Sequence, residues 1–176
     1  MQDKDGFYFF WGGPFSQWAS FDMEIDGLVY YTCEQYMMAE KAKLFKDVET
    51  YAQIMKEKDP KKQKVLGRQV KNFDKDEWEK IARDVVYKAN YAKFTQHPDL
   101  NDSLIQTHGK EIVEASPYDC IWGIGLGEND KRRWNRDQWR GTNWLGEEIM
   151  KVRETLIVNK LKEEVNRERA IHGENK

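Results

Sequence analysis

The sequence has no run of apolar residues near the roughly twenty that a membrane-spanning helix needs. Its first ten residues, MQDKDGFYFF, lack the basic segment and long apolar stretch of a signal peptide. The chain has only two cysteines, Cys33 and Cys120, which could form at most one disulfide. Without a secretion signal the reduced state is expected. We therefore expect a cytoplasmic protein that makes no membrane contact.

An excess of one charge is also missing. Charged residues make up 34% of the chain, but the formal net charge is only -2, so no general basic field attracts nucleic acid. The three histidines (His97, His108 and His172) lie far apart, and there is no CxxC or HExxH motif. The sequence therefore predicts neither a metal site nor a cofactor.

The chain does have the length of one domain and many aromatic side chains. Its 176 residues can bury a sizeable core, so we expect a single domain over 1–176. Aromatic residues make up 13% of the chain and include seven tryptophans. Such side chains suit a core and also a pocket for planar ligands.

Strand patterns lie mainly at the front of the chain. The segment FYFFW (7–11) predicts a short strand, and residues 21–31 predict a hairpin around Asp26-Gly27, a dipeptide that favours a tight turn. Residues 111–116 predict another strand, followed by a glycine-punctuated loop or strand end. With the helices described next, the fold class is α+β, mostly helical, with a small N-terminal hairpin or sheet.

Helix signals dominate the rest. Thr32 and Gln35 fit a capping box, which predicts a helix from about 32 to 45. Asp59-Pro60 and Asp74-x-x-Glu77 predict two further helix starts, and a shorter helix from 97 is closed by Gly109. Residues 143–161 predict a last amphipathic helix. The charged tail from about 163 is expected to fray.

Glu34 and Lys41 stand seven positions apart in EQYMMAEKA, close to two helical turns. They project on the same side of the helix, roughly 10 Å apart along its axis. In one interpretation Glu34 merely favours the helix N-terminus and Lys41 extends past neighbouring methionines to solvent. In the other, a partly buried carboxylate is a general acid or base and a desolvated lysine is a nucleophilic amine. Spacing by itself favours the first.

Other segments suggest a binding site. SPYDCIWGIGLG brings together Asp119, Trp122 and several glycines, which either line a phosphate or simply end a strand. KRRWNRDQWRGTNWLG interleaves arginines with tryptophans, which suits base stacking and phosphate pairing but also a solvated basic loop. Cys33 is a third candidate, as a nucleophile beside Glu34, although no histidine is near in sequence to activate it.

Four segments in this order resemble the NADAR family, the YbiA-like N-glycosidases, over nearly the whole chain. They are FSQWASFDMEIDGLVYYTCEQYMMAEKA, KFTQHPDL, SPYDCIWGIGL and WRGTNWLGEEIMKVRETL. The resemblance implies a single α+β domain that cleaves N-glycosidic bonds of ribosides. The substrates it implies are phosphorylated intermediates of riboflavin biosynthesis or ADP-ribose attached to guanine, free or within nucleic acid.

The resemblance also assigns residues. Glu34 matches the family's catalytic glutamate, and Lys41 matches a lysine proposed to engage the anomeric carbon of the sugar. Asp119 and Trp122 match a D-x-x-W-G element. Gly141, Asn143, Leu145 and Gly146 match G-x-N-x-L-G. The chain departs from the family at Met38, where many relatives have glutamine, and at Gln17, where they have asparagine. Because these side chains make different contacts, the resemblance does not identify the exact substrate.

We therefore expect an N-glycosyl hydrolase with Glu34 and Lys41 as catalytic residues. Trp122 is expected to stack on the base, with Trp18 as a second candidate, and Asp119 to orient its neighbours. Asn143, Gly123 and Gly125 are expected to hold ribose hydroxyls or phosphate, and Arg132 or Arg133 to reach the phosphate. The alternatives are a module that binds ADP-ribose or a nucleotide without turnover, and a single-stranded nucleic-acid binder that uses the Arg/Trp segment.

Overall fold

The computed structural model describes residues 6–173 and has the mostly helical α+β architecture that the sequence predicts. The strands in these residues are β1 (Phe7–Phe10), β2 (Met23–Ile25), β3 (Leu28–Tyr30) and β4 (Glu111–Glu114). The α-helices are α1 (Cys33–Leu44), α2 (Val48–Lys56), α3 (Pro60–Arg68), α4 (Lys75–Gln96), α5 (Pro98–Ile105) and α6 (Trp144–Gly173). Two short 3-10 helices, η1 (Lys131–Trp134) and η2 (Arg136–Gln138), lie between β4 and α6.

The strands form two separate pairs. β1 and β4 are parallel, with Phe7 opposite Glu111 and Phe10 opposite Glu114. β2 and β3 form the predicted hairpin, whose turn residues Asp26 and Gly27 have φ values of 53° and 78°. Two left-handed residues in succession are what the tight hairpin turn requires. β1 and β4 are far apart in the sequence, so short sequence patterns could not predict that they pair.

The start of α1 is fixed by side-chain hydrogen bonds. Thr32 caps the helix as predicted, because its Oγ1 accepts the Gln35 N–H at 3.0 Å. Gln35 reaches back as predicted, to the residue before the N-cap, because its Oε1 accepts the N–H of Tyr31 at 2.7 Å. The Gln35 amide donates to the carbonyls of Ile54 and Glu57, at 2.9 and 3.1 Å. Gln35 thus ties the first turn of α1 to the end of α2, a helix that the sequence patterns did not predict.

The other predicted helix starts are confirmed. Asp59 Oδ1 accepts the Lys61 N–H at 2.8 Å, and Asp74 Oδ1 accepts the Glu77 N–H at 2.9 Å. The shorter helix α5 ends at Ile105, and Gly109 follows in a turn with a φ of 83°.

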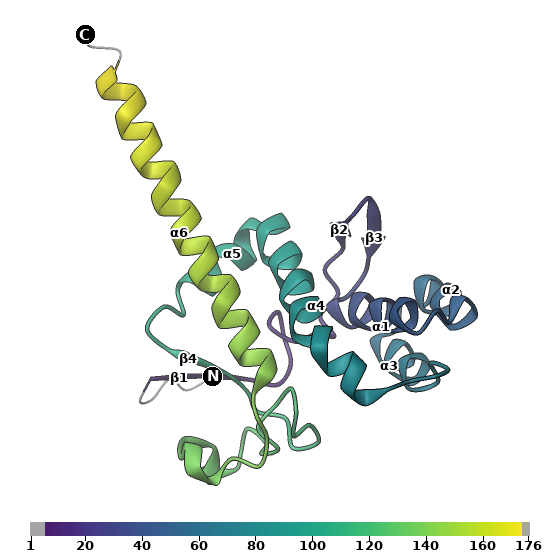
Figure 1. Ribbon diagram of the computed structural model, residues 1–176. Helices are drawn as coiled ribbons and strands as arrows, with labels where there is room; N and C mark the ends of the chain where they lie inside the picture. The colour runs from purple at the N-terminus through teal and green to yellow at the C-terminus, as the bar shows by residue number, and fades with distance from the viewer. Residues whose placement is uncertain (1–5, 174–176) are drawn as a thin grey trace.

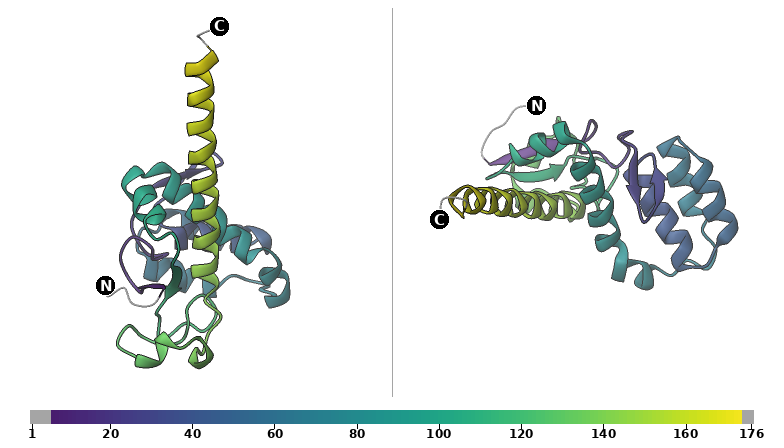
Figure 2. Two further views of the ribbon diagram at one scale, coloured as in Figure 1. Left: turned by 90° about the vertical axis from the view of Figure 1, so that its left-hand side faces the viewer. Right: turned by 90° about the horizontal axis from the view of Figure 1, so that it is seen from above.

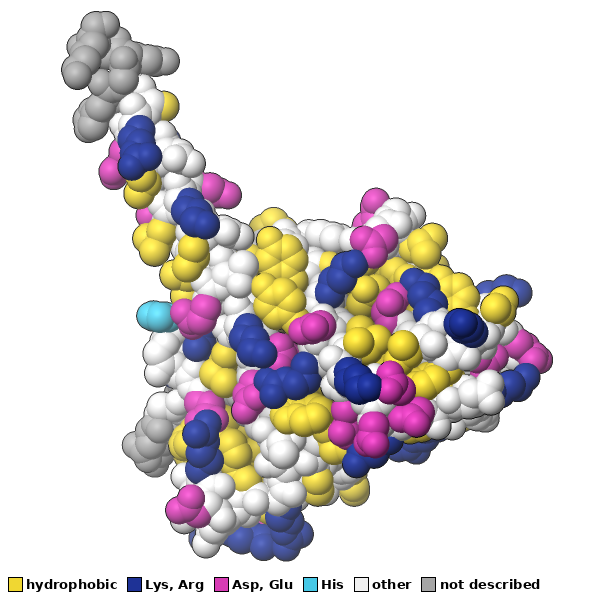
Figure 3. Space-filling view, viewed as in Figure 1, with side chains coloured by type: hydrophobic (Ala, Val, Ile, Leu, Met, Phe, Trp, Pro, Cys, Tyr) yellow, Lys and Arg dark blue, Asp and Glu magenta, His cyan; other side chains and the backbone are white. Residues whose placement is uncertain are grey.

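The charged tail from about 163, which is expected to fray, is helical in this structure, because α6 continues through Gly173. Residues 147–172 contain no glycine or proline, and the tail is rich in lysine, glutamate and arginine, which have high helix propensity. Figures 1 and 3 show the last turns of α6 projecting away from the body of the molecule. The projecting part carries exposed apolar side chains at Leu161, Val165 and Ile171.

Helix α4 lies at the centre of the arrangement. It contacts α1 on one side and α6 on the other, and α6 also packs on β4 (Figures 1 and 2). Helices α2 and α3 pack against α1, so α1 is covered from several directions and most of its side chains are buried. Within residues 6–173, no helix has the length and apolar character required to cross a bilayer.

Candidate active site

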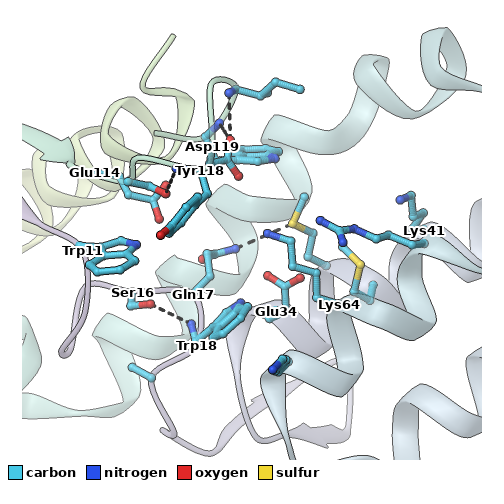
Figure 4. A pocket seen from close by; sticks show the side chains of 18 of the residues that line it. Trp11, Ser16, Gln17, Trp18, Glu34, Lys41, Lys64, Glu114, Tyr118 and Asp119 are labelled. Atoms are coloured by element: carbon cyan, nitrogen blue, oxygen red, sulfur yellow. Dashed lines mark hydrogen bonds between the residues drawn. The ribbon is translucent and has the colours of Figure 1, made fainter. Parts of the chain in front are cut away.

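A cavity of about 1160 Å³ lies where several parts of the chain meet. Its walls come from the segment 11–21, from α1 and α3, from the start of α4, and from the loop at 114–122 that follows β4. Figure 4 shows the polar and aromatic side chains that point into it. Both carboxylates and cations line this one space, so it is the candidate active site.

Glu34 is buried in the first turn of α1, with 6% of its surface exposed. Its backbone N–H donates to the Gln17 carbonyl oxygen at 3.0 Å. This hydrogen bond holds the chain around Gln17 against the start of α1. Burial is the main cause that raises the pKa of Glu34, and nearby Asp119 adds to it, while Lys64, the Trp18 side chain and Lys41 oppose the shift. The resulting pKa is about 7, compared with an ordinary value of 4.5. The carboxyl group can therefore take or give a proton near neutral pH.

Lys41 lines the same cavity from the same helix, as the seven-residue spacing predicts. Its Nζ donates to the Gly67 carbonyl at 3.1 Å and lies 4.4 Å from the centre of the Phe73 ring. Burial lowers the pKa of this amine. A Cβ at Gly67 would stand 1.8 Å from Met38 Sδ, so glycine is what lets α3 approach α1 closely and bring its carbonyl to Lys41.

Helix α3 supplies cations that no sequence motif singled out. Lys61, Lys64 and Arg68 recur at intervals of three and four residues, so they share the face of α3 that lines the cavity. Lys64 Nζ also lies 5.8 Å from the centre of the Trp18 ring. With Lys41, these side chains make one wall positively charged.

Three of the predicted binding residues line the cavity: Trp18, Asp119 and Trp122. Asp119 Oδ1 accepts the N–H groups of Ile121 and Trp122, at 2.9 and 2.7 Å, so it orders the loop as expected. Trp122 packs edge-on against Trp144, with ring centres 5.7 Å apart. Trp18 is 41% exposed and available for stacking.

Asn143 and the glycines do not line the cavity, contrary to their predicted contacts with ribose or phosphate. Asn143 is buried, where its Nδ2 donates to the Ile112 carbonyl at 2.9 Å and its Oδ1 accepts the Glu114 N–H at 3.0 Å. A Cβ at Gly123 would lie 2.9 Å from the Glu114 carbonyl oxygen, and Gly125 has a φ of 67°. Their lack of side chains serves the close packing of this loop.

Arg133 is also outside the cavity. Its guanidinium group lies over the Phe9 and Trp134 rings, 4.7 and 4.9 Å from their centres. The segment 131–139 packs on the outer side of β1, where Trp139 Nε1 donates to the Arg133 carbonyl at 2.7 Å. The structure thus places Arg133 outside this cavity, whereas the cations of α3 line it, and the predicted contact of Arg133 with a phosphate stays a prediction.

Three further lining residues were not predicted from the sequence: Trp11, Glu114 and Tyr118. Glu114 ends β4 just before the SPYDCIW segment, and a charged residue at the end of a buried strand is the signal that could have identified it. Among the residues that the structure describes, no group of three or more histidine, cysteine, aspartate or glutamate side chains is placed to hold a metal. The cavity therefore offers carboxylates, amines and aromatic rings.

Comparison with known proteins relates this fold and cavity to a family. The model of the NADAR domain matches residues 8–157. Protein irg-1 of Caenorhabditis elegans is 46% identical over 133 residues, which cover 73% of this chain and 62% of that protein. N-glycosidase R617 of Acanthamoeba polyphaga mimivirus is 44% identical over 145 residues, covering 80% of this chain and 85% of the relative.

The bacterial relatives are more distant but share the structure. N-glycosidase YbiA of Escherichia coli (strain K12) is 30% identical over 148 residues, covering 84% of each chain. The NMR structure of the E. coli protein YbiA superposes with a TM-score of 0.75 at 29% identity, over 91% of this chain and 90% of that one. The matched segment contains every residue that lines the cavity. The chain therefore belongs to the NADAR domain family.

Proposed function

We propose that this NADAR-family N-glycosidase hydrolyses the N-glycosidic bond of a phosphorylated riboside or an ADP-riboside. The observation that carries the proposal is the composition of one cavity, in which a buried glutamate with a pKa near neutrality faces a wall of lysine and arginine side chains. The glutamate can stabilise positive charge at the sugar carbon C1′, and the cations can pair with phosphate.

Glu34 is assigned to the reacting carbon. Cleavage of an N-riboside passes through a transition state with positive charge on C1′ and the ring oxygen, which a carboxylate stabilises. The same carboxylate accepts a proton from the attacking water. A pKa of about 7 lets Glu34 be an effective base without being fully protonated at neutral pH.

Lys41 is assigned to the opened sugar. Its burial lowers the pKa of the amine, which increases the fraction in the neutral, nucleophilic form. Attack of Nζ on C1′ of the opened sugar expels the base as the C1′–N bond breaks, and it leaves a Schiff base that water then hydrolyses. Arginine could not take this role, because its guanidinium group stays protonated.

The cationic wall and the size of the cavity favour a nucleotide. Lys64 and Arg68 lie on α3, next to Lys41, where they can pair with one or two phosphate groups. A cavity of about 1160 Å³ exceeds what a drug-sized ligand requires, so it has room for an ADP-riboside as well as a phosphoribosyl compound.

Relatives named N-glycosidase support this class of reaction. A non-catalytic module for ADP-ribose is a weaker explanation, because binding alone gives no reason to bury Glu34 beside a lysine. A single-stranded nucleic-acid binder is weaker still. The face in Figure 3 intersperses basic and acidic side chains, and Arg133 of the Arg/Trp segment packs on aromatic rings.

The test is incubation with a panel of phosphoribosyl and ADP-ribosyl N-glycosides, including ADP-ribosylated guanine, with mass spectrometry of the released base. We expect release of free base from at least one phosphorylated compound and none from its unphosphorylated form. Binding without release would contradict the hydrolase assignment and favour the non-catalytic module.

A pair of variants tests the phosphate wall. Lys64→Ala should raise KM for the phosphorylated substrate by about tenfold, since a charged hydrogen bond contributes about 1.5 to 3 kcal/mol. Lys62→Ala is the matched control, because Lys62 is exposed on the same helix and does not line the cavity. Equal effects of the two substitutions would place the phosphate elsewhere.

A further inference from the structure

Glu114 is a second carboxylate in the cavity that the mechanism above does not use. Its Oε2 atom is buried and has no hydrogen-bond partner in the structure. Figure 4 shows it near Trp11 and Tyr118, on the opposite side of the view from Lys41. A buried carboxyl oxygen left unpaired at a cavity wall is costly unless a ligand completes it.

The backbone of Glu114 is held rigidly. Its N–H donates to Asn143 Oδ1 at 3.0 Å, its carbonyl accepts the Ile124 N–H at 3.0 Å, and the residue pairs with Phe10 in the parallel sheet. The buried Asn143 side chain therefore holds the end of β4 in place. The carboxyl group enters the cavity from a rigid element, as a catalytic group must.

The surroundings of Glu114 favour its neutral form. Burial is the main cause that raises its pKa, and the charges of Asp119 and Glu34 add to it, while Lys64 on α3 opposes the shift. The resulting pKa is about 8, compared with an ordinary value of 4.5. Asp119 lies in the loop after β4, Glu34 lies on α1 and Lys64 lies on α3. At neutral pH Glu114 therefore carries a proton that it can donate.

The neighbouring rings suit a planar group. Trp11 and Tyr118 are 46% and 86% exposed, and their ring centres lie 6.1 Å apart. Neither ring is used by the core, and exposed aromatic side chains beside a cavity are typical of base-stacking surfaces. The end of the cavity marked by Glu114 is thus aromatic, whereas the end marked by Lys41 is cationic.

We propose that Glu114 is a further catalytic residue, the acid that protonates the departing base, and that Trp11 and Tyr118 form the subsite that holds this base. The assignment rests on the proposed N-glycosidase function. As the C1′–N bond breaks, its electron pair stays on nitrogen and Glu114 gives its proton to the base. Water then adds to C1′ of the Lys41 Schiff base, loses a proton to the Glu34 carboxylate and releases the sugar from Lys41. Proton transfer through solvent from Glu34 to Glu114 restores both groups.

The test uses leaving groups that differ in their need for a proton. One substrate is the N-riboside that the wild-type protein cleaves, and the other is the 4-nitrophenyl riboside with the same phosphorylation, whose nitrophenolate leaves unprotonated. Glu114→Gln should lose on the order of 10² or more in kcat on the N-riboside. It should stay within several-fold of wild type on the nitrophenyl compound. Glu34→Gln should lose activity on both, because both need charge stabilisation at C1′.

Glu111→Gln is the matched control, since Glu111 lies on the same strand and pairs with Arg136 outside the cavity. It should match wild type on both substrates. Equal losses of Glu114→Gln on the two substrates would overturn the acid assignment and make Glu114 a contact to the sugar. Unchanged activity on the N-riboside would overturn it as well. A wild-type protein that cleaves neither substrate would instead refute the proposed function, and the role of Glu114 with it.

The aromatic subsite has its own readout. Trp11→Ala should raise KM for the N-riboside by about tenfold, and free base should protect wild-type tryptophan fluorescence from acrylamide quenching. Trp139→Ala, which alters a tryptophan outside the cavity, should leave KM unchanged. An unchanged KM for Trp11→Ala would remove Trp11 from the subsite.

Discussion

Glu34 and Lys41 line one cavity from the same side of α1, and each is held by a backbone contact to a different neighbour. The Glu34 N–H donates to the Gln17 carbonyl at 3.0 Å, and Lys41 Nζ donates to the Gly67 carbonyl at 3.1 Å. The segment 11–21 and helix α3 are thereby positioned on either side of the same two turns of helix. Side chains from both elements line the cavity around this pair.

Glu34→Gln should lower kcat by on the order of 10² or more, because it removes the charge that stabilises C1′ and the group that accepts a proton. KM should change little, since the amide keeps the size of the side chain. Glu40→Gln is the control on the same helix, where Glu40 pairs with Lys43 away from the cavity. Steady-state kinetics of both variants decide the matter, and near wild-type turnover of Glu34→Gln would mean that the residue only favours the helix start.

Lys41→Ala should abolish any enzyme–substrate adduct that borohydride can trap, because only an amine forms a reducible Schiff base. Mass spectrometry of the intact protein after reduction provides the measurement, and Lys43→Ala on the same helix should still trap. The Glu34→Gln, Lys41→Ala double variant should be little worse than the worse single one. Near wild-type turnover of Lys41→Ala would make the lysine a phosphate contact and exclude the covalent step.

Trp122 is expected to contact the same base as Trp11 and Tyr118, so Trp122→Ala should weaken substrate binding by about 1 to 3 kcal/mol, the usual contribution of an aromatic side chain that stacks on a base. Trp122→Phe should retain most of the affinity, because phenylalanine keeps a stacking face. Binding of substrate to these variants in the Glu34→Gln background, where turnover is slow, gives the affinities directly. A folded Trp122→Ala protein with unchanged affinity would show that this ring does not contact the ligand.

The rate should have a maximum between pH 7 and pH 8. Glu34 must be ionised to act as base, so kcat should rise as the pH passes its pKa of about 7. Glu114 must be protonated to act as acid, so kcat should fall as the pH passes its pKa of about 8. Glu114→Gln should remove the fall on the alkaline side and leave the acidic side in place. A profile that keeps both limbs in this variant would assign the alkaline limb to another group.

Stability should depend on pH through the same carboxyl group. The pKa of Glu114 is higher in the folded state than its ordinary value of 4.5, so the neutral side chain favours folding fully below pH 4.5. This contribution is lost as the pH rises through about 8. Glu114→Gln should therefore gain stability relative to wild type between pH 5 and pH 9, by up to a few kcal/mol. Urea unfolding of both proteins at pH 5 and pH 9 measures this difference in stability. A difference that does not change with pH would contradict a buried, neutral Glu114.

The sequence by itself determined the local elements and the shared helix face of Glu34 and Lys41. Asp26-Gly27, Thr32, Asp59 and Asp74 act through neighbours a few residues away, so their turn and caps were predictable from short patterns. The spacing of Glu34 and Lys41 fixed their common side of α1, because helical geometry depends only on the number of intervening residues. The ordered motifs by themselves indicated the family, because together they extend over nearly the whole chain.

Tertiary structure alone decided which other residues share the cavity. Glu114 reaches it because β4 pairs with β1 and is fixed by Asn143, contacts between segments far apart in the chain. Lys64 reaches it because α3 packs closely on α1 at Gly67. Long-range packing also keeps the side chains of Asn143 and Arg133 out of the lining of the cavity. Motifs specify which residue types are available, whereas long-range packing decides which of them a ligand can touch.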